Sequence, residues 1–298
     1  MPELPEVQTI VNDLNNKLKN DKIIGFWTEW RKSIKNISKK GFVEDIKDRK
    51  ILNVRRLGKS ILIDLSKKNS SSKKPEKTLY IHLKMTGHLL VRGEVEDEKD
   101  FDNYFEEKVN KYVRHSWKLR SSGGKIRRLN FSDVRKFAKI MLVKTEDVGD
   151  LAEISRLGID ALDKRFNLKR FKEILNKKKK VSIGKVLMDQ EVIAGIGNIY
   201  RSEILFESCV DPEKLSGDLK EKEIGVIYKN IKNTLRKALR MRGTSDSDYR
   251  DTSGAPGRFQ KVLKVYRRAG KECEKCGSIV EGIKIAQRSV FICPKCQK

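Results

Sequence analysis

The chain has 298 residues and a formal net charge of +26 at pH 7. This length supports one large or two medium domains, and the charge favours a polyanionic partner such as nucleic acid, although a lysine-rich source genome would also raise it. The sequence has no apolar run of about eighteen residues and no signal-peptide core, which excludes a helical membrane span and predicts a soluble, cytoplasmic protein.

The chain begins Met-Pro-Glu-Leu-Pro-Glu-Val, and a helix is predicted directly behind this start. Pro5 suits the first turn of a helix, and Glu6 complements its positive N-terminal end. Apolar residues then recur at helical spacing: Val7, Ile10, Val11, Leu14 and Leu18.

Pro2 and Glu3 stand ahead of this helix and offer a specific chemistry. Removal of Met1 would free the nitrogen of Pro2, a secondary amine that attacks an aldehydic or hemiacetal carbon and forms an iminium. The ordinary pKa of an α-amino group leaves a useful neutral fraction near pH 7. The carboxylate of Glu3 can carry the proton. Met-Pro is also a common start of a chain, so the pair alone leaves a purely structural role open.

Short strands are predicted over residues 23–30, 51–57, 61–65 and 79–83. Gly58 and Lys59 form the turn between the second and third of these strands, and Met85-Thr86-Gly87 forms a turn after the fourth. A Gly-Lys turn is ordinarily an exposed loop, and a methionine beside a strand is ordinarily part of the core. These two turns therefore name no function by themselves.

The middle of the chain carries fewer signals. Residues 92–110 are acidic and aromatic without a clear periodicity, and Gly123-Gly124 marks a hairpin turn. Arg135 and Phe137 lie two residues apart after an aspartate. A surface arginine and a core phenylalanine at the end of a strand are the ordinary interpretation of that pair.

The second half is predicted to be helical over residues 166–175, 183–188 and about 220–240, and residues 193–200 are predicted to enter a further helix that runs through 204–206. The Gly195-x-Gly197-Asn198 segment is no dinucleotide fingerprint, because no βαβ unit surrounds it. Its glycines allow the backbone to approach a phosphate, and Asn198 is predicted to cap the following helix. Cys209 is predicted to be a buried thiol, and residues 242–259 read as a mobile loop.

The C-terminus contains two C-x2-C pairs separated by sixteen residues: Cys273 with Cys276, and Cys293 with Cys296. The intervening segment alternates apolar and polar residues, which predicts a β-hairpin that brings the pairs together around one zinc ion. Two disulfides are the alternative. From residue 258 to 298 there are eleven lysines or arginines and three glutamates. This charge suits contact with phosphates, although a solvated basic surface would look the same.

The start, the turns and the terminal finger, in this order, resemble the formamidopyrimidine-DNA glycosylase (Fpg/Nei) family, bacterial enzymes that excise oxidised purines from DNA. The resemblance covers nearly the full chain and implies an α+β fold. An N-terminal catalytic β-sandwich with its N-terminal helix would span residues 1–150. A helix–two-turn–helix DNA-binding domain would span residues 151–262, and a four-cysteine zinc β-hairpin finger residues 263–298.

The resemblance implies a bifunctional glycosylase and abasic-site lyase of base excision repair that removes 8-oxoguanine and formamidopyrimidines. Pro2 would form the Schiff base, Glu3 would help to protonate the sugar ring oxygen, and β,δ-elimination would cut the strand. Lys59 would contact the backbone beside the lesion and help catalysis. Arg288, in the zinc hairpin, would contact the phosphates that flank the lesion.

Five further residues would contact DNA by the same resemblance. Met85 would fill the gap left by the flipped nucleotide, Arg135 would hydrogen-bond the orphaned base, and Phe137 would wedge beside it. Asn198 would hold phosphates near the damaged nucleotide. Lys179 matches a substrate-contacting basic residue.

Three places depart from the family or stay unassigned. Many members have a phosphate-binding histidine where this chain has Lys111-Tyr112-Val113-Arg114-His115. Which of these residues takes over its role stays open, with Tyr112 as the candidate for a DNA contact. The 92–110 segment is expected to have no clear counterpart in the family. The 242–259 loop matches the region that covers the flipped base, but its individual residues have no assigned role.

The expected partner is double-stranded DNA with oxidised bases, bound by a monomer with one structural Zn²⁺ and no nucleotide cofactor or membrane contact. Two alternatives stay open. One is a Nei-type glycosylase for oxidised pyrimidines. The other is a non-catalytic zinc DNA-binding protein, which would need neither a free Pro2 nor Glu3.

Overall fold

The computed structural model describes residues 1–70, 72–93, 104–285 and 287–298. The chain forms two compact units, Met1–Ser155 with Met241–Arg258, and Arg156–Arg240 with Phe259–Lys298. The first unit therefore includes a segment that follows the last long helix of the second. In the described ranges, no helix combines the length and the apolar character needed to cross a membrane.

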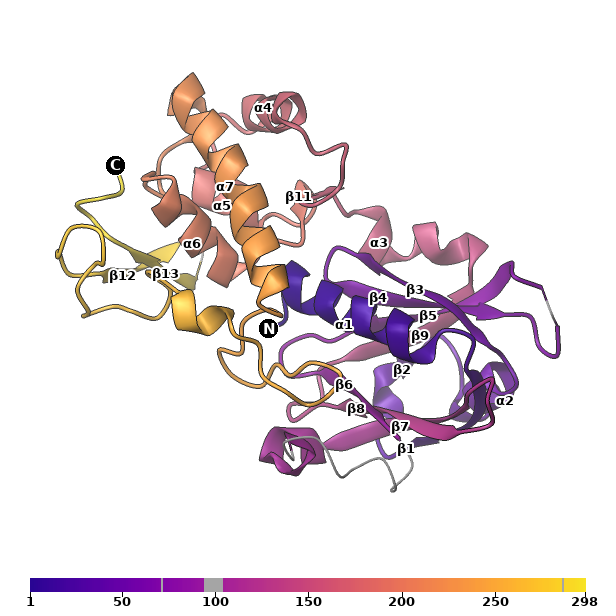
Figure 1. Cartoon of the computed structure of the whole chain (residues 1–298). Coiled ribbons are helices and arrows are strands. Elements are labelled where there is room, and N and C mark those ends of the chain that lie inside the picture. The colour runs from indigo at the N-terminus through magenta and orange to yellow at the C-terminus, as the bar shows by residue number, and fades with distance from the viewer. Residues whose placement is uncertain (71, 94–103, 286) are drawn as a thin grey trace. The chain divides into compact units, whose positions relative to one another are not determined.

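The first unit contains two β-sheets (Figure 1). The four-stranded sheet has the order β1 (Lys22–Thr28), β7 (Val113–Arg120), β8 (Ile126–Ser132), β6 (His88–Arg92). The five-stranded sheet has the order β2 (Ile34–Lys35), β9 (Lys139–Lys144), β5 (Pro75–His82), β4 (Ser60–Ser66), β3 (Ile51–Leu57). Neighbouring strands are antiparallel except β2 and β9. Buried residues of both sheets share one core, so the unit is a β-sandwich, as the resemblance implied.

Helix α1 (Leu4–Leu18) confirms the predicted N-terminal helix. Glu3 is its N-cap in a reciprocal capping box with Glu6, and Pro5 occupies the first turn. The predicted apolar face is buried in the core of the sandwich, and α1 lies along β3 and β4 (Figure 1). The short elements of this unit are α2 (Lys39–Ile46), α3 (Ala152–Ser155) and the 3₁₀ helices η1 (Arg31–Ser33), η3 (Tyr104–Glu106), η4 (Lys108–Lys111) and η5 (Glu146–Asp150).

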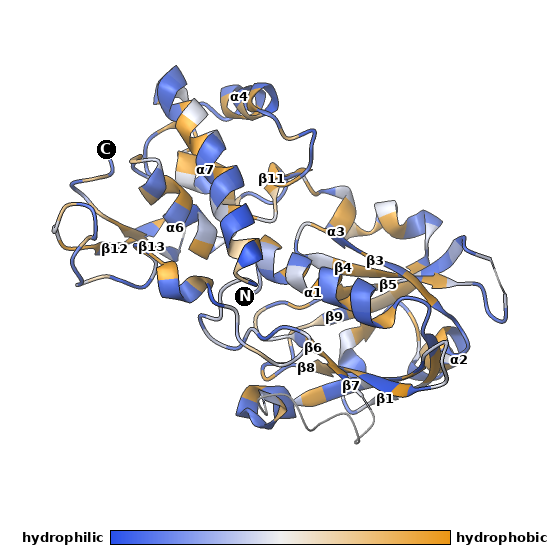
Figure 2. Cartoon of the chain, viewed as in Figure 1, coloured by the Kyte–Doolittle hydropathy of each residue, from blue (hydrophilic) through white to orange (hydrophobic). Residues whose placement is uncertain are grey.

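The second unit is mainly helical. Its helices are α4 (Leu168–Lys177), α5 (Ile183–Met188), α6 (Asn198–Glu207) and α7 (Glu221–Arg240), with 3₁₀ helices η6 (Ser216–Asp218) and η7 (Phe259–Val262). Two short strands, β10 (Ile159–Asp160) and β11 (Ile193–Ala194), pair in parallel. Strands β12 (Glu281–Ile285) and β13 (Arg288–Ile292) form the predicted C-terminal hairpin. Apolar positions recur along α7, as expected of a helix with one buried face (Figure 2).

The predictions about the start of α4 and about Cys209 were wrong. The helix predicted from residue 166 begins at Leu168, because the side chain of Asn167 accepts a hydrogen bond from the Arg170 amide and caps the helix there. Cys209 is exposed and not buried. It follows the end of α6 with a φ of 56°, and this left-handed turn directs the chain out of the helical register that predicted its burial.

The acidic and aromatic 92–110 segment is described only in part. Residues 94–103 lie outside the described residues. The remainder forms η3 and η4 and ends at Asn110, a fully buried residue on the four-stranded sheet side of the first unit.

Candidate active site and metal centre

Pro2 and Glu3 are both buried, whereas Met1 is exposed. The amide of Glu3 donates to Oε2 of Glu6 over 2.7 Å. The second oxygen of Glu6 accepts a 2.7 Å hydrogen bond from the Thr244 amide. The capping box that starts α1 therefore holds the predicted nucleophile and acid in place, and it also binds the 241–258 segment.

Lys59 follows Gly58, whose φ of 54° forms the tight turn between β3 and β4. The Arg56 side chain donates to the Gly58 carbonyl and to Oε1 of Gln8, both over 2.8 Å. Gln8 belongs to α1, so the Lys59 turn is tied to the helix that follows Pro2 and Glu3. The Lys59 side chain is largely buried, and the predicted exposed loop is therefore a constrained turn.

No sequence motif marked His82, which lies at the end of β5, as a candidate site residue. Burial lowers its pKa to about 4, with the charges of Lys84 and Lys59 acting in the same direction, so the imidazole is neutral at pH 7. Its Nδ1 accepts a 3.0 Å hydrogen bond from the Lys84 amide, which leaves the proton on Nε2. Its position three residues before Met85 was the sequence feature that could have indicated a place near the site.

Met85, Arg135 and Phe137 lie together and form what we call the wedge cluster. Met85 is 42% exposed and Phe137 51% exposed, so the core interpretation of both is wrong. One guanidinium nitrogen of Arg135 lies 3.0 Å from the Met85 sulfur. The guanidinium carbon is 4.7 Å from the centroid of the Phe137 ring. Two large apolar side chains and a cation thus share one exposed site.

Asp133 organises both loops of the wedge cluster from a fully buried position. Its Oδ1 accepts from the Arg135 amide over 3.2 Å and from the Thr86 hydroxyl. Its Oδ2 accepts from the amides of Phe137 and Ala138, over 2.9 and 3.1 Å. One carboxylate therefore fixes the Met85 turn and the Arg135 loop relative to each other.

We expect Asp133→Ala to unfold with a free energy lower by about 2–4 kcal/mol, because four donors lose a charged acceptor. If Arg135 and Phe137 contact the opposite base, as the resemblance implies, opposite-base selectivity should weaken at the same time, because both residues lose their common support. Urea unfolding and excision assays with each opposite base measure the two effects. Asp147→Ala, at an exposed position, is the matched control. Unchanged stability and selectivity in Asp133→Ala would contradict this role.

Tyr112 is half-buried beside Asp133, whose amide donates to the Tyr112 carbonyl over 3.1 Å. The Arg114 guanidinium lies over the Tyr112 ring and donates through Nε to the Asp133 carbonyl over 2.9 Å. His115 is fully buried with Nε2 2.9 Å from the Ser33 hydroxyl. Because His115 is fully buried, it cannot contact a phosphate, and Tyr112 and its neighbours stay as candidates for that contact.

Asn198 is the first residue of α6 and not its cap, which is Gly197, so the predicted capping role is wrong. Its Nδ2 donates to the Ser289 carbonyl over 2.9 Å, and its Oδ1 accepts from the Arg201 side chain. Ser289 directly follows the exposed Arg288. The second unit thus brings Asn198 to the start of β13, at the turn end of the zinc hairpin and next to Arg288.

Lys179 lies apart from this pair, in the turn after α4. Its side chain is exposed, and its carbonyl accepts a 3.0 Å hydrogen bond from the Gly217 amide. Pro2, Glu3, Lys59 and the wedge cluster belong to the first unit, whereas Lys179, Asn198 and Arg288 belong to the second.

The four cysteines of the finger gather as predicted: Cys273, Cys276, Cys293 and Cys296 place all their sulfurs within 4.8 Å of one another. The Cys273 and Cys296 sulfurs are 3.9 Å apart, and those of Cys276 and Cys293 are 3.5 Å apart. A tetrahedral zinc–thiolate centre with bonds of about 2.3 Å has edges of about 3.8 Å. The donor set therefore fits one structural zinc ion and leaves no open coordination position.

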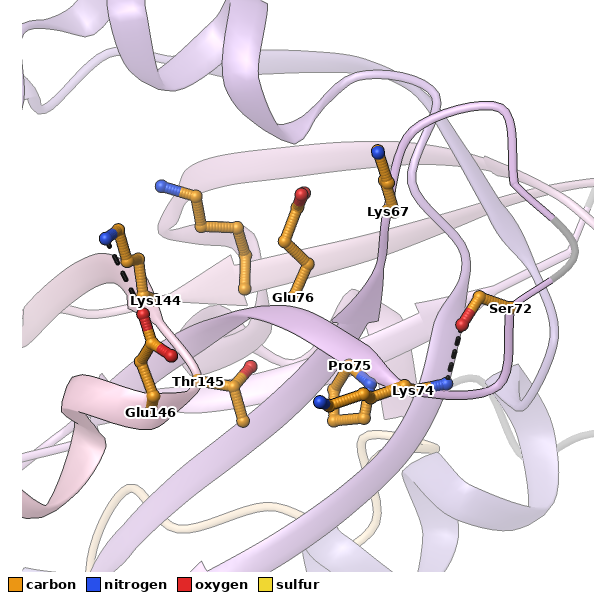
Figure 3. Close-up of a pocket in the computed structure, with 9 residues that line it drawn as sticks. Lys67, Ser72, Lys74, Pro75, Glu76, Lys144, Thr145 and Glu146 are labelled. Carbon is orange, nitrogen blue, oxygen red and sulfur yellow. Dashed lines mark hydrogen bonds and ion pairs between the residues drawn. The ribbon is translucent and has the colours of Figure 1, made fainter.

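A separate basic pocket of 660 Å³ lies at the opposite ends of β5 and β9 from the Met85 turn (Figure 3). Lys67, Lys74, Lys77 and Lys144 line it together with Glu76 and Glu146. Lys144 pairs with Glu146 over 3.5 Å, and Glu76 with Arg49 over 2.5 Å. None of the predicted site residues lines this pocket.

Comparison with known proteins gives the same assignment along the whole chain. Residues 1–140 match the model of the formamidopyrimidine-DNA glycosylase N-terminal domain, and residues 157–250 match its H2TH domain. Residues 270–298 match the zinc finger found in FPG and IleRS.

Full-length relatives agree. Formamidopyrimidine-DNA glycosylase of Pelotomaculum thermopropionicum is 35% identical over 298 residues, with 100% of this chain and 99% of the relative covered. That of Herpetosiphon aurantiacus is 36% identical with 100% of both covered. A Lactococcus lactis Fpg solved in complex with abasic-site DNA has a TM-score of 0.82, 27% identity and 99% coverage of both chains. The chain belongs to the formamidopyrimidine-DNA glycosylase family.

Proposed function

We propose that this DNA glycosylase of base excision repair removes oxidised purines through a Pro2 Schiff base and then cuts the strand by β,δ-elimination. The exposed wedge cluster is the observation that carries the proposal. The fold does not require two large apolar side chains beside a cation in solvent. A duplex from which one nucleotide has been flipped offers a gap of matching chemistry, with an orphaned base for Arg135.

The reaction follows from the groups at the N-terminus. After loss of Met1, the Pro2 nitrogen attacks the anomeric carbon, and the base leaves with the bonding electrons of the glycosidic bond. Glu3 protonates the sugar ring oxygen, so that the ring opens to an iminium. The iminium acidifies the adjacent hydrogens, and β- and then δ-elimination release the two phosphates. Lys59 places its charge beside the phosphate backbone at this site.

The second unit would hold the DNA backbone. Asn198 and Arg288 contact the phosphates near the lesion in this proposal, and Lys179 and Tyr112 add further contacts. In this proposal residues 1–150 supply catalysis, 151–262 the helical DNA-binding part and 263–298 the zinc finger. The protein would act as a monomer on double-stranded DNA in the cytoplasm, at the nucleoid. The zinc ion holds the finger and takes no part in the reaction.

A preference for oxidised pyrimidines is the second candidate. One structure of the Lactococcus lactis Fpg, with a TM-score of 0.82 and 27% identity, is a complex with DNA that contains an oxidised pyrimidine. A site of this kind therefore accepts such DNA in a relative, and the lesion has to be assigned by experiment.

Borohydride trapping tests the proposal, because borohydride reduces an iminium to a stable amine. We expect a covalent adduct on a duplex with 8-oxoguanine opposite cytosine, and peptide mapping should place it on Pro2. The protein should first be shown by intact mass to lack Met1. A matched duplex without a lesion is the control.

Two other outcomes of the trapping experiment would change the assignment, one of the substrate and one of the mechanism. An adduct formed only with oxidised pyrimidines would favour the second candidate. No adduct with any lesion, from protein that has lost Met1 and holds zinc, would overturn the Schiff-base mechanism and favour a protein that only binds DNA.

A further inference from the structure

Asn110 is a fully buried amide at the end of the acidic and aromatic 92–110 segment. Its Nδ2 donates to the carbonyls of Tyr104 and Gly254, over 2.6 and 3.2 Å. Its Oδ1 lies 2.8 Å from Nε2 of His88. One side chain thus joins η3, strand β6 and the 241–258 segment.

The partners fix the orientation of both side chains. Because Nδ2 of Asn110 faces two carbonyls, its Oδ1 must face His88, and His88 must then carry its proton on Nε2. His88 is also fully buried, and its Nδ1 lies 3.2 Å from the Thr86 carbonyl. Thr86 belongs to the turn that presents Met85.

These contacts extend from the wedge cluster to the 241–258 segment. Asp133 receives the amides of Arg135 and Phe137 and the hydroxyl of Thr86. The Thr86 carbonyl adjoins His88, which donates to Asn110, and Asn110 donates to Gly254. Every side chain in this polar chain between the cluster and Gly254 is buried. With the His88 proton on Nε2, Nδ1 of His88 and the Thr86 carbonyl are both acceptors, so this one contact is packing and not a hydrogen bond. The hydrogen bonds of Asp133 on one side and of Asn110 on the other fix the two loops.

The opposite end of the 241–258 segment reaches the predicted nucleophile. The Thr244 amide donates to Glu6, and Glu6 receives the Glu3 amide next to Pro2. The segment therefore contacts both the cap that holds Pro2 and, through Asn110, the turn that carries Met85. If Pro2 attacks the sugar as proposed above, the displaced base would border this segment.

Asn110 packs closely against Gly254, and neighbouring residues make further contacts between the same segments. Gly254 has a φ of +81°, and a Cβ added there would lie 2.9 Å from Nδ2 of Asn110. Glu107 pairs with Arg250 over 2.7 Å, and the Val91 amide donates to the Thr252 carbonyl over 2.8 Å. The described part of the 92–110 segment thus packs on the 241–258 segment.

We propose that His88 and Asn110 are positioning residues that hold the 241–258 segment in register with the wedge cluster, and that base excision depends on them. This inference rests on the proposed function. Excision requires the damaged base to be held at the segment while Pro2 attacks. A preformed abasic site has no base to hold, so its cleavage needs the segment much less.

Single-turnover rates on two duplexes test the inference. For Asn110→Ala we expect about a tenfold lower rate of 8-oxoguanine excision, because the buried Gly254 carbonyl and the His88 N–H lose their partner. Incision of a preformed abasic site should stay within about twofold of the wild-type rate, since the same energetic loss does not act on that step. A generally destabilised enzyme would lose both activities together.

A second pair of variants keeps the test independent of folding yield. His88→Gln retains a donor toward Asn110 and should keep near wild-type excision, whereas His88→Leu removes it and should lose excision selectively. Glu106→Gln, at an exposed position of the same segment, is the control for surface changes. Thermal unfolding of each variant accompanies the rates.

The rates distinguish a failure of the positioning role from a failure of the proposed function. Equal loss on both duplexes, no loss on either, or a His88→Gln variant as impaired as His88→Leu would overturn the positioning role. A wild-type protein that cleaves neither duplex would instead overturn the proposed function.

Discussion

Pro2→Gly should lower the rate of 8-oxoguanine excision by at least about a hundredfold and reduce the borohydride adduct in parallel, because the nucleophile is the residue that makes the covalent bond. Glycine still allows removal of Met1, but it replaces a rigid secondary amine with a flexible primary one. Single-turnover excision at a fixed salt concentration and the yield of trapped adduct measure the effect. DNA affinity should change little, since Pro2 forms no part of the phosphate contacts.

Two companion variants separate chemistry from structure. Glu3→Gln should also lose about a hundredfold or more, which is the size of a lost proton transfer. Pro5→Ala is the matched control, because it changes the other proline of the same capping turn and leaves the amine and the acid intact. Excision by Pro2→Gly at the rate of Pro5→Ala would show that the N-terminal amine is not the nucleophile.

The sequence predicted those parts of the fold that depend on local patterns. The apolar period of α1 and the two C-x2-C pairs each encode an element directly, and the structure has both. The predicted strands at 51–57, 61–65 and 79–83 correspond to β3, β4 and β5, although β5 begins four residues earlier, at Pro75. The start of α4 was misplaced by two residues because the cap of Asn167 overrides the apolar period there. Burial of Cys209 failed for a related reason, since periodicity cannot show where a helix ends in a left-handed turn.

The residues of the site could be predicted only where they belong to a motif shared with the family. Lys59, Met85, Arg135 and Phe137 came from the family resemblance, because a turn lysine or a strand-end phenylalanine has an ordinary structural explanation in isolation. Their support could not be predicted. Asp133 binds Thr86 across 47 positions and Asn110 binds Gly254 across 144. Such contacts follow from the packing of the whole unit, which no local pattern encodes.

Asn110 also shows why a segment without a recognisable motif can matter. Its sequence carries neither a periodic pattern nor a motif, so composition alone suggested an acidic, aromatic loop. In the structure the described part satisfies polar groups of the 241–258 segment, including the Gly254 carbonyl and Arg250. A buried polar group left without a partner is costly, and the two segments are therefore expected to vary together in related chains.

Removal of zinc should weaken the binding of lesion DNA by about a hundredfold or more and should leave the first unit folded. The hairpin has a small apolar core of its own, in which Ile285, Val290 and Ile292 are buried, so the metal must supply most of its stability. Structural zinc contributes about 10–16 kcal/mol of apparent binding energy in small fingers. Unfolding would release Arg288 and take the Ser289 carbonyl away from Asn198.

Fluorescence anisotropy with an abasic-site duplex measures this loss, before and after chelation and at one salt concentration, because phosphate contacts depend steeply on salt. Metal analysis should give one zinc ion per chain, and Cys276→Ala should lose it. Cys209→Ser is the matched control, since it removes the exposed thiol outside the cluster. Unchanged affinity after complete loss of zinc would show that the finger does not contact DNA. Retention of two disulfides in place of metal would show that the cysteines were assigned to the wrong chemistry.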